Sequence, residues 1–138
     1  ATGIDNLVDA VARVRALARF KARPDFESLA VAFKRVVNII KDPEVALIDP
    51  KLFQHDTERE LFRMIGETEQ NVVECTAKSD YDGALATMAR LKAPIDAFFD
   101  SVLVMDKYEA IRRNRLALLT RIRDLFSKVA DFRKIQTP

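Results

Sequence analysis

Three arginines and one asparagine occupy four consecutive positions, 112–115, in the C-terminal part of the chain. On a helix, Arg112 and Arg113 project off the apolar face, and Asn114 lies at its edge. Guanidinium groups hold phosphate oxygens, and an amide either recognises a base edge or caps a loop. These residue types at this spacing favour contact with RNA, in which cations hold phosphates and a few polar groups recognise unpaired bases.

Other cationic and amide residues extend this candidate surface into the N-terminal part of the chain. Lys34, Asn38 and Lys41 form a row on the polar side of one predicted helix, and further cations end the helix before it. The candidate RNA-contacting residues are Arg19, Lys21, Arg23, Lys34, Arg35, Asn38, Lys41, Arg112, Arg113 and Asn114. The alternative is that these side chains form ordinary solvated helix faces.

Arg115 is expected to have a different role from its neighbours. At 100° per residue it lies about 20° from Ile122, the centre of the apolar face of its helix. An arginine in that position needs a carboxylate partner. Asp96 or Asp100, on the preceding helix, is the predicted partner, so we interpret Arg115 as structural.

Residue types for catalysis or metal binding are sparse. The one histidine, His55, lies in a loop-like stretch, and Cys75 has no neighbouring base, so a solvated ring and an inert thiol are expected. Three scattered glycines build no phosphate-binding loop, and the usual zinc-ligand spacings are missing. We therefore predict no catalytic residue, no metal site and no cofactor in this chain.

Five segments with helical periodicity must position these residues, and no segment alternates with the period of a strand. They run from about 4 to 21, from 25 to 41, from Thr57 or Asp49-Pro50, from Ser79 and from Lys107. The predicted fold is an all-α bundle of about five helices in one domain, residues 1–138, excised from a larger chain.

Finer expectations concern which residues face inward and where helices end. In the first helix Ile4, Leu7, Val8, Val11 and Val14 are predicted to face inward. In the fourth, a seven-residue repeat of Tyr81, Met88, Ile95 and Val102 marks a packing stripe, with a break before Pro94. Capping pairs are predicted for Thr57 with Glu60, Ser79 with Asp82, and Asp106 with Glu109.

Composition is that of a soluble globular chain, with 49% hydrophobic and 32% charged residues and no apolar run of membrane-spanning length. A single cysteine fits a reducing compartment, and a cytoplasmic location is expected. The net charge of +2 combines +4 over residues 1–41, −7 over 42–82 and +5 over 106–138. If the two basic ends lie side by side, they form one positive face.

Four blocks of sequence carry a resemblance to a known family. They are FFDSVLVMDKYEAIRRNRLALL from residue 98, FKARPDFESLAVAFKRVVNIIKD from residue 20, YDGALATMARLKAPIDAFFD from residue 81 and VADFRKIQ from residue 129. The chain resembles the DALR anticodon-binding domains, most closely those that end the beta subunits of bacterial glycyl-tRNA synthetases. The resemblance covers about Val11 to Gln136, and the family's tetrapeptide stands here as Glu109-Ala110-Ile111-Arg112, with two conservative changes.

This resemblance implies a non-catalytic domain that holds the anticodon end of a glycine-accepting tRNA. It also implies an alpha subunit as partner, where ATP, Mg and glycine are handled, and neither DNA nor membrane binding. The near alternative is the DALR domain of another synthetase, such as the arginine enzyme. A helical subunit-docking module without an RNA role is the alternative from a different class.

Overall fold

The computed structural model describes the backbone of residues 2–41 and 47–129, and the side chains there except those of 2–9, Asp25 and Val129. All regular structure in these ranges is helical, which confirms the predicted all-α class. The elements are α1 (Thr2–Lys21), α2 (Pro24–Ile39), a 3₁₀ helix η1 (Pro50–Leu52), α3 (Asp56–Ala77), α4 (Tyr81–Ala89), α5 (Lys92–Ser101) and α6 (Glu109–Val129).

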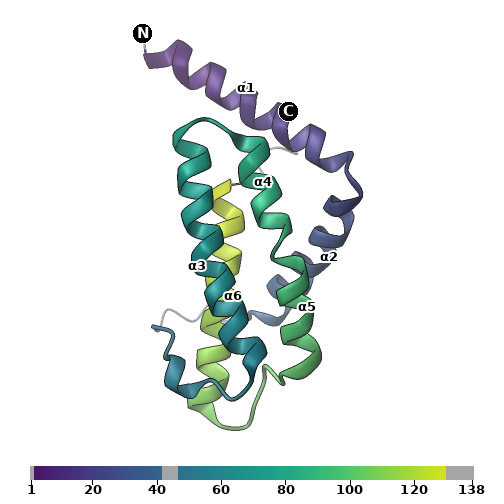
Figure 1. Cartoon of the computed structure of the whole chain (residues 1–138), viewed down its shortest axis with the longest axis vertical. Helices are drawn as coiled ribbons and strands as arrows, with labels where there is room; N and C mark the ends of the chain where they lie inside the picture. Colours follow the sequence, from purple (N-terminus) through teal and green to yellow (C-terminus); the bar gives the residue numbers. More distant parts are fainter. Residues whose placement is uncertain (1, 42–46, 130–138) are drawn as a thin grey trace.

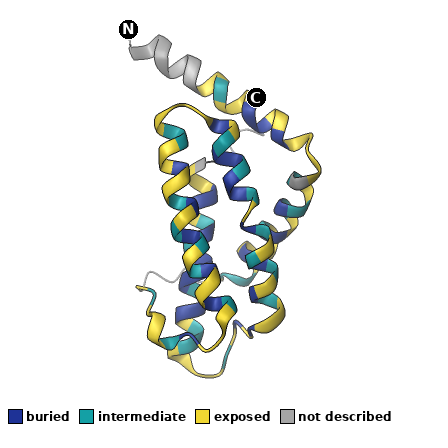
Figure 2. Cartoon of the chain, viewed as in Figure 1, coloured by how far each residue is buried: buried dark blue, intermediate teal, exposed yellow. Residues whose placement is uncertain are grey.

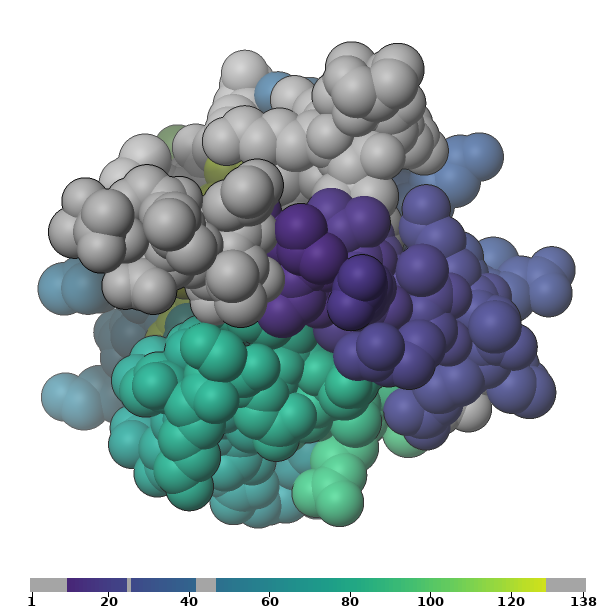
Figure 3. All heavy atoms as spheres, turned by 90° about the horizontal axis from the view of Figure 1, so that it is seen from above, coloured from purple at the N-terminus to yellow at the C-terminus, as the bar shows by residue number. Residues whose placement is uncertain are grey.

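The long helices α3 and α6 run in the same direction along the bundle, and α4 and α5 return antiparallel to them (Figure 1). α2 packs against α5 and α6. α1 packs against α4, and in the view from above its described part lies beside the end of the bundle where α3 and α4 meet (Figure 3). The basic segments 1–41 and 106–138 are therefore in contact through α2 and α6.

The buried side chains form one hydrophobic core that faces the interior of the bundle (Figure 2). The predicted stripe of the fourth helix is confirmed, since Tyr81, Met88, Ile95 and Val102 are all buried. Burial of such side chains stabilises the fold by about 1.5–3 kcal/mol each. The helices of the described residues therefore share a single hydrophobic core.

A break divides the fourth predicted helix into α4 and α5. Pro94 has no N–H to donate to the carbonyl of Arg90, and its ring crowds that carbonyl. The chain accordingly leaves the α-helix at Arg90 and Leu91 and resumes it at Lys92. The predicted break is confirmed, and it gives six α-helices rather than five in the described ranges.

Two of the predicted helix starts are shifted by local hydrogen bonds. α3 is capped by His55 with Glu58, one turn into the helix, rather than by Thr57 with Glu60. α4 is capped by the Asp80 side chain, which accepts the N–H of Gly83 at 3.0 Å, rather than by Ser79. Ser79 instead has φ 56°, the left-handed conformation that ends α3 and turns the chain.

The start of α6 also differs from the prediction. The helix begins at Glu109, two residues later than expected, and the Asp106 carboxylate accepts the N–H of Tyr108 at 2.9 Å. Asp106 therefore organises the turn before α6, and no capping pair between Asp106 and Glu109 is present. This turn leaves Glu109 in the first turn of the helix.

The inward face predicted for α1 is wrong where the structure describes it. Val11 and Val14 are 40% and 50% exposed, whereas Ala16, Leu17 and Phe20 are buried. The backbone of the first half of α1 extends past the end of the bundle (Figure 1). The predicted core positions Ile4, Leu7 and Val8 lie outside the described side chains.

A matched pair of substitutions in α1 tests where its contribution to the core begins. Leu17→Ala should lower the free energy of unfolding by about 2–5 kcal/mol because it opens a cavity. Val14→Ala, one turn earlier, should change it by less than about 0.5 kcal/mol. Urea denaturation followed by circular dichroism measures both, and equal losses would contradict the observed boundary.

Candidate nucleic-acid interface

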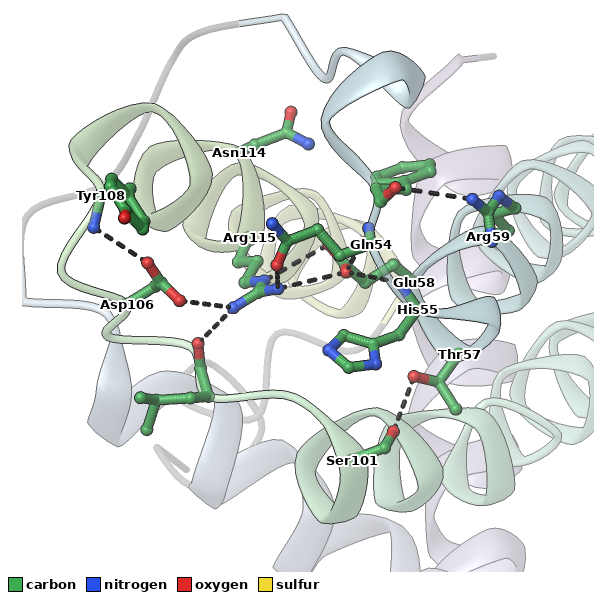
Figure 4. Close-up of polar contacts among 12 residues, drawn as sticks. Gln54, His55, Thr57, Glu58, Arg59, Ser101, Asp106, Tyr108, Asn114 and Arg115 are labelled. Atoms are coloured by element: carbon green, nitrogen blue, oxygen red, sulfur yellow. Dashed lines mark hydrogen bonds and ion pairs between the residues drawn. The ribbon is translucent and has the colours of Figure 1, made fainter.

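Arg115, near the start of α6, lies at the centre of a buried polar network and is 1% exposed (Figure 4). Its Nε and Nη2 atoms donate to the two carboxylate oxygens of Glu58, each at 3.3 Å. Nη1 donates to the carbonyl of Leu103 at 2.6 Å and to Asp106 Oδ2 at 3.5 Å, and Nη2 also donates to Gln54 Oε1 at 3.1 Å. The guanidinium group thus joins α6 to α3 and to both adjoining loops.

The burial and the carboxylate pairing of Arg115 agree with its predicted structural role, but the predicted partners are wrong. Asp96 accepts instead from Lys92, one turn earlier on α5, at 2.6 Å. Asp100 is exposed. The true partner, Glu58, is fully buried and also accepts the N–H groups of Gln54 and His55 at 3.0 and 3.1 Å. These contacts hold the carboxylate in place for Arg115.

Asn114 is not available to contact RNA. Its amide is 4% exposed, and it forms a two-way pair with the backbone of Asp49, accepting from the N–H at 2.7 Å and donating to the carbonyl at 3.0 Å. The sequence left two roles open for this amide, base recognition and loop capping. In the structure the amide caps a loop. Asn114 fixes the segment before η1 against α6.

Four of the candidate residues line one surface groove of about 710 Å³, where the end of α2 meets the start of α6. Asn38 and Lys41 come from the α2 end, and Arg112 and Arg113 come from α6. The groove has four further lining residues that the sequence pattern did not indicate: Ile39, Met105, Leu116 and Glu109. The first three give the groove an apolar component, so it can accommodate a flat base as well as phosphates.

Local contacts orient the arginines of this groove without burying them completely. Arg112 is half-buried and donates to the carbonyl of Asp106 at 3.2 Å. Arg113 is exposed, with Nη1 3.9 Å from the Glu109 carboxylate. Ion pairs this exposed contribute little to stability. The groove therefore concentrates positive charge at the surface, which favours a polyanionic ligand.

Lys21 and Lys34 line a second hollow of about 400 Å³, together with Glu27 and the apolar residues Phe26, Ala30 and Val31. Lys34, Asn38 and Lys41 are spaced by four and three residues on one side of the chain at α2. Lining residues of the second hollow and of the groove therefore follow one another along the same side of this helix. Both offer exposed ammonium groups.

The remaining candidates make contacts inside the domain. Arg19 forms a two-pronged hydrogen bond with Asp82 of α4, which raises the pKa of the guanidinium. Arg23 lies over the Phe20 ring and Arg35 over the Phe99 ring, with the guanidinium carbon 5.7 and 4.3 Å from the ring centroids. These three arginines line neither hollow.

The described residues also show where side chains that could bind a metal ion lie. No three His, Cys, Asp or Glu side chains there are grouped so as to hold a metal ion. Cys75 is half-buried, and His55 is exposed and takes part in the cap of α3. None of the described helices is long and apolar enough to span a membrane.

Comparison with known proteins agrees with the resemblance seen in the sequence. Residues 29–138 match the model of the DALR anticodon binding domain, and the chain belongs to this family. Glu109 and Arg112, the first and last residues of its version of the family tetrapeptide, both line the groove.

Among curated proteins, the chain is similar to glycine–tRNA ligase beta subunits of several bacteria. It is 48% identical over 135 residues to that of Geotalea daltonii and 49% identical over 139 residues to that of Anaeromyxobacter dehalogenans. These matches cover 98% and 99% of this chain. The chain spans about a fifth of the length of these relatives.

Removing the buried arginine tests the network that positions the groove. Arg115→Met should lower the free energy of unfolding by about 3–5 kcal/mol, because Glu58 would keep a buried charge without its partner. Arg63→Met is the matched control, since Arg63 also pairs with two carboxylates, Glu60 and Glu67, but on the exposed face of α3. In urea denaturation the control should lose far less stability, and equal losses would contradict the assigned role.

Proposed function

We propose that this chain is the anticodon-binding domain of a glycine–tRNA ligase beta subunit and that it holds the anticodon arm of glycine tRNA. The observation that carries the proposal is the groove where α2 and α6 bring Asn38, Lys41, Arg112 and Arg113 together. Membership of the DALR family and the similarity to glycine–tRNA ligase beta subunits support the identity of the ligand.

The proposed groove has the chemistry that single-stranded RNA loops require. Cations at its edges would hold the phosphates on either side of an unstacked nucleotide, and the apolar side chains of Ile39, Met105 and Leu116 would contact the base. Lys21, at the end of α1, and Lys34, on α2, would contact phosphates outside the loop.

We infer that aminoacylation itself takes place elsewhere in the assembly. In this proposal a companion alpha subunit holds ATP, Mg²⁺ and glycine, and the present domain supplies binding energy at the remote end of the tRNA. Such remote binding energy orients the reacting end of a substrate. The proposed role of this chain is therefore positioning rather than catalysis.

Binding of RNA hairpins to the 138-residue chain tests the proposal. Fluorescence anisotropy should show tighter binding to a glycine-tRNA anticodon stem-loop than to the same hairpin with a changed anticodon, with affinity falling as salt rises. Lys41→Gln and Arg112→Gln should each weaken binding about fivefold or more, and reduce the salt slope by about 1. Lys78→Gln is the control, because Lys78 is the residue that ends α3 and it lines neither hollow. This substitution should leave binding unchanged.

Two outcomes of the same titration would count against anticodon recognition. Weak binding that ignores the anticodon would reduce the groove to a non-specific basic surface. Absence of binding at low salt would contradict the proposal and favour a docking role between subunits.

Substitutions in the second hollow separate phosphate contacts from base recognition. Lys21→Gln and Lys34→Gln should weaken binding to the cognate and the changed hairpin by the same factor, because phosphate contacts carry no sequence information. The ratio of the two dissociation constants should therefore stay at the wild-type value, measured by the same anisotropy titration. A changed ratio would place base recognition in the second hollow.

A further inference from the structure

Glu109 is the one carboxylate among the described residues that line the groove, which Lys41, Arg112 and Arg113 also line. Its side chain is 72% exposed, and its Oε1 atom lies 3.9 Å from Nη1 of Arg113. That separation exceeds hydrogen-bonding distance, so the pair does not consume the acceptor capacity of the carboxylate. The groove therefore presents a strong hydrogen-bond acceptor among its cations.

A carboxylate in this position works against phosphate binding, because it repels the backbone of any nucleic acid. It favours instead a ligand that donates a hydrogen bond. An ionised carboxylate accepts hydrogen bonds and donates none, and among base contacts Glu and Asp typically accept from the N4 amino group of cytosine.

Together with Glu109, the hydrogen-bond donors that line the groove match the pairing edge of one base. Arg112 and Asn38, on the two helices that form the groove, carry N–H donors. The pairing edge of cytosine presents one donor, the N4 amino group, and two acceptors, N3 and O2. Uracil presents an acceptor at O4 and a donor at N3. In the same orientation, O4 would face the carboxylate of Glu109, another acceptor, and the N3–H group would face one of the protein donors. The donor and acceptor set of the groove thus fits cytosine and opposes uracil.

We propose that Glu109 determines base specificity in this groove by accepting a hydrogen bond from the amino group of an anticodon cytosine. Arg112 and Asn38 donate to the N3 and O2 atoms of the same base. The inference rests on the proposed function, since glycine codons begin with two guanines and the anticodons that pair with them end in two cytosines. One groove that selects cytosine therefore provides a direct check of a glycine anticodon.

A purely structural role for Glu109 has a different signature. A carboxylate in the first turn of a helix stabilises the helix dipole by about 0.3–1 kcal/mol. Loss of that interaction lowers the melting temperature but leaves the choice between cytosine and uracil unchanged. Base discrimination and thermal stability must therefore be measured on the same variants.

The test compares anticodon stem-loops carrying both cytosines with hairpins in which each cytosine is replaced singly by uracil. The wild-type chain should bind the natural hairpin about tenfold or more tightly than at least one uracil hairpin. In Glu109→Gln this ratio should fall to about threefold or less, because the glutamine amide donates to uracil O4 as readily as it accepts from cytosine. The variant should also bind that uracil hairpin more tightly than wild type, since a charge that repels phosphate is gone.

Asp56→Asn is the matched control. Asp56 is also a first-turn carboxylate that pairs with an arginine on its own helix, Arg59 at 2.8 Å, and it lines neither hollow. It should keep the wild-type ratio. A Glu109→Gln variant that keeps the wild-type ratio, with or without a lower melting temperature, overturns this inference alone. A wild-type chain that binds no hairpin overturns the proposed function together with it.

Discussion

The buried pair between Arg115 and Glu58 is the interaction on which the geometry of the candidate interface depends. A charged pair with almost no solvent exposure is costly unless further hydrogen bonds satisfy both partners. Here the guanidinium also donates to Gln54, Leu103 and Asp106, and the carboxylate also accepts two backbone N–H groups. No buried side-chain nitrogen or oxygen among the described residues lacks a partner. The pair therefore specifies one relative placement of α3, α6 and the α5–α6 connection.

That placement fixes the groove as a consequence. Arg112 lies one turn before Arg115 on the side of α6 that meets α2, and its own side chain donates to the same α5–α6 connection, at the carbonyl of Asp106. Asn114 holds the other flanking segment through the backbone of Asp49. The two arginines of the groove thus lie on a helix start that two buried polar side chains, Arg115 and Asn114, hold in place. Such support lets an exposed site keep its shape before a ligand arrives, which reduces the entropy lost on binding.

The sequence predicted those features that depend on short-range patterns. The stripe from Tyr81 to Val102 and the break before Pro94 follow from helical periodicity and from the missing N–H of proline, both of which act within a few residues. The sequence put Asn38, Lys41, Arg112 and Arg113 among the candidates, but it left their meeting conditional on the two basic ends lying side by side, and the contact between α2 and α6 meets that condition. By contrast, the partner of Arg115 lies 57 residues away, and no periodicity identifies Glu58 among the many carboxylates of α3. The error at Val11 and Val14 has a similar cause, since burial there depends on where the bundle ends rather than on the spacing along α1.

The acidic middle of the chain explains how a domain of small net charge can still present a basic surface. On α3, Glu60 and Glu67 pair with Arg63, and Asp56 pairs with Arg59, so much of this charge is compensated within the helix itself. Glu69 pairs with Arg121 of α6 across the helix interface, and that hydrogen bond raises the pKa of the arginine. Lys21 at the end of α1, Lys34 on α2 and Lys41 just after α2 are exposed, and none of them belongs to α3, which carries these carboxylates. Because screening in water limits the reach of each charge to about 8–10 Å, local arrangement rather than net charge sets the field that an approaching RNA meets.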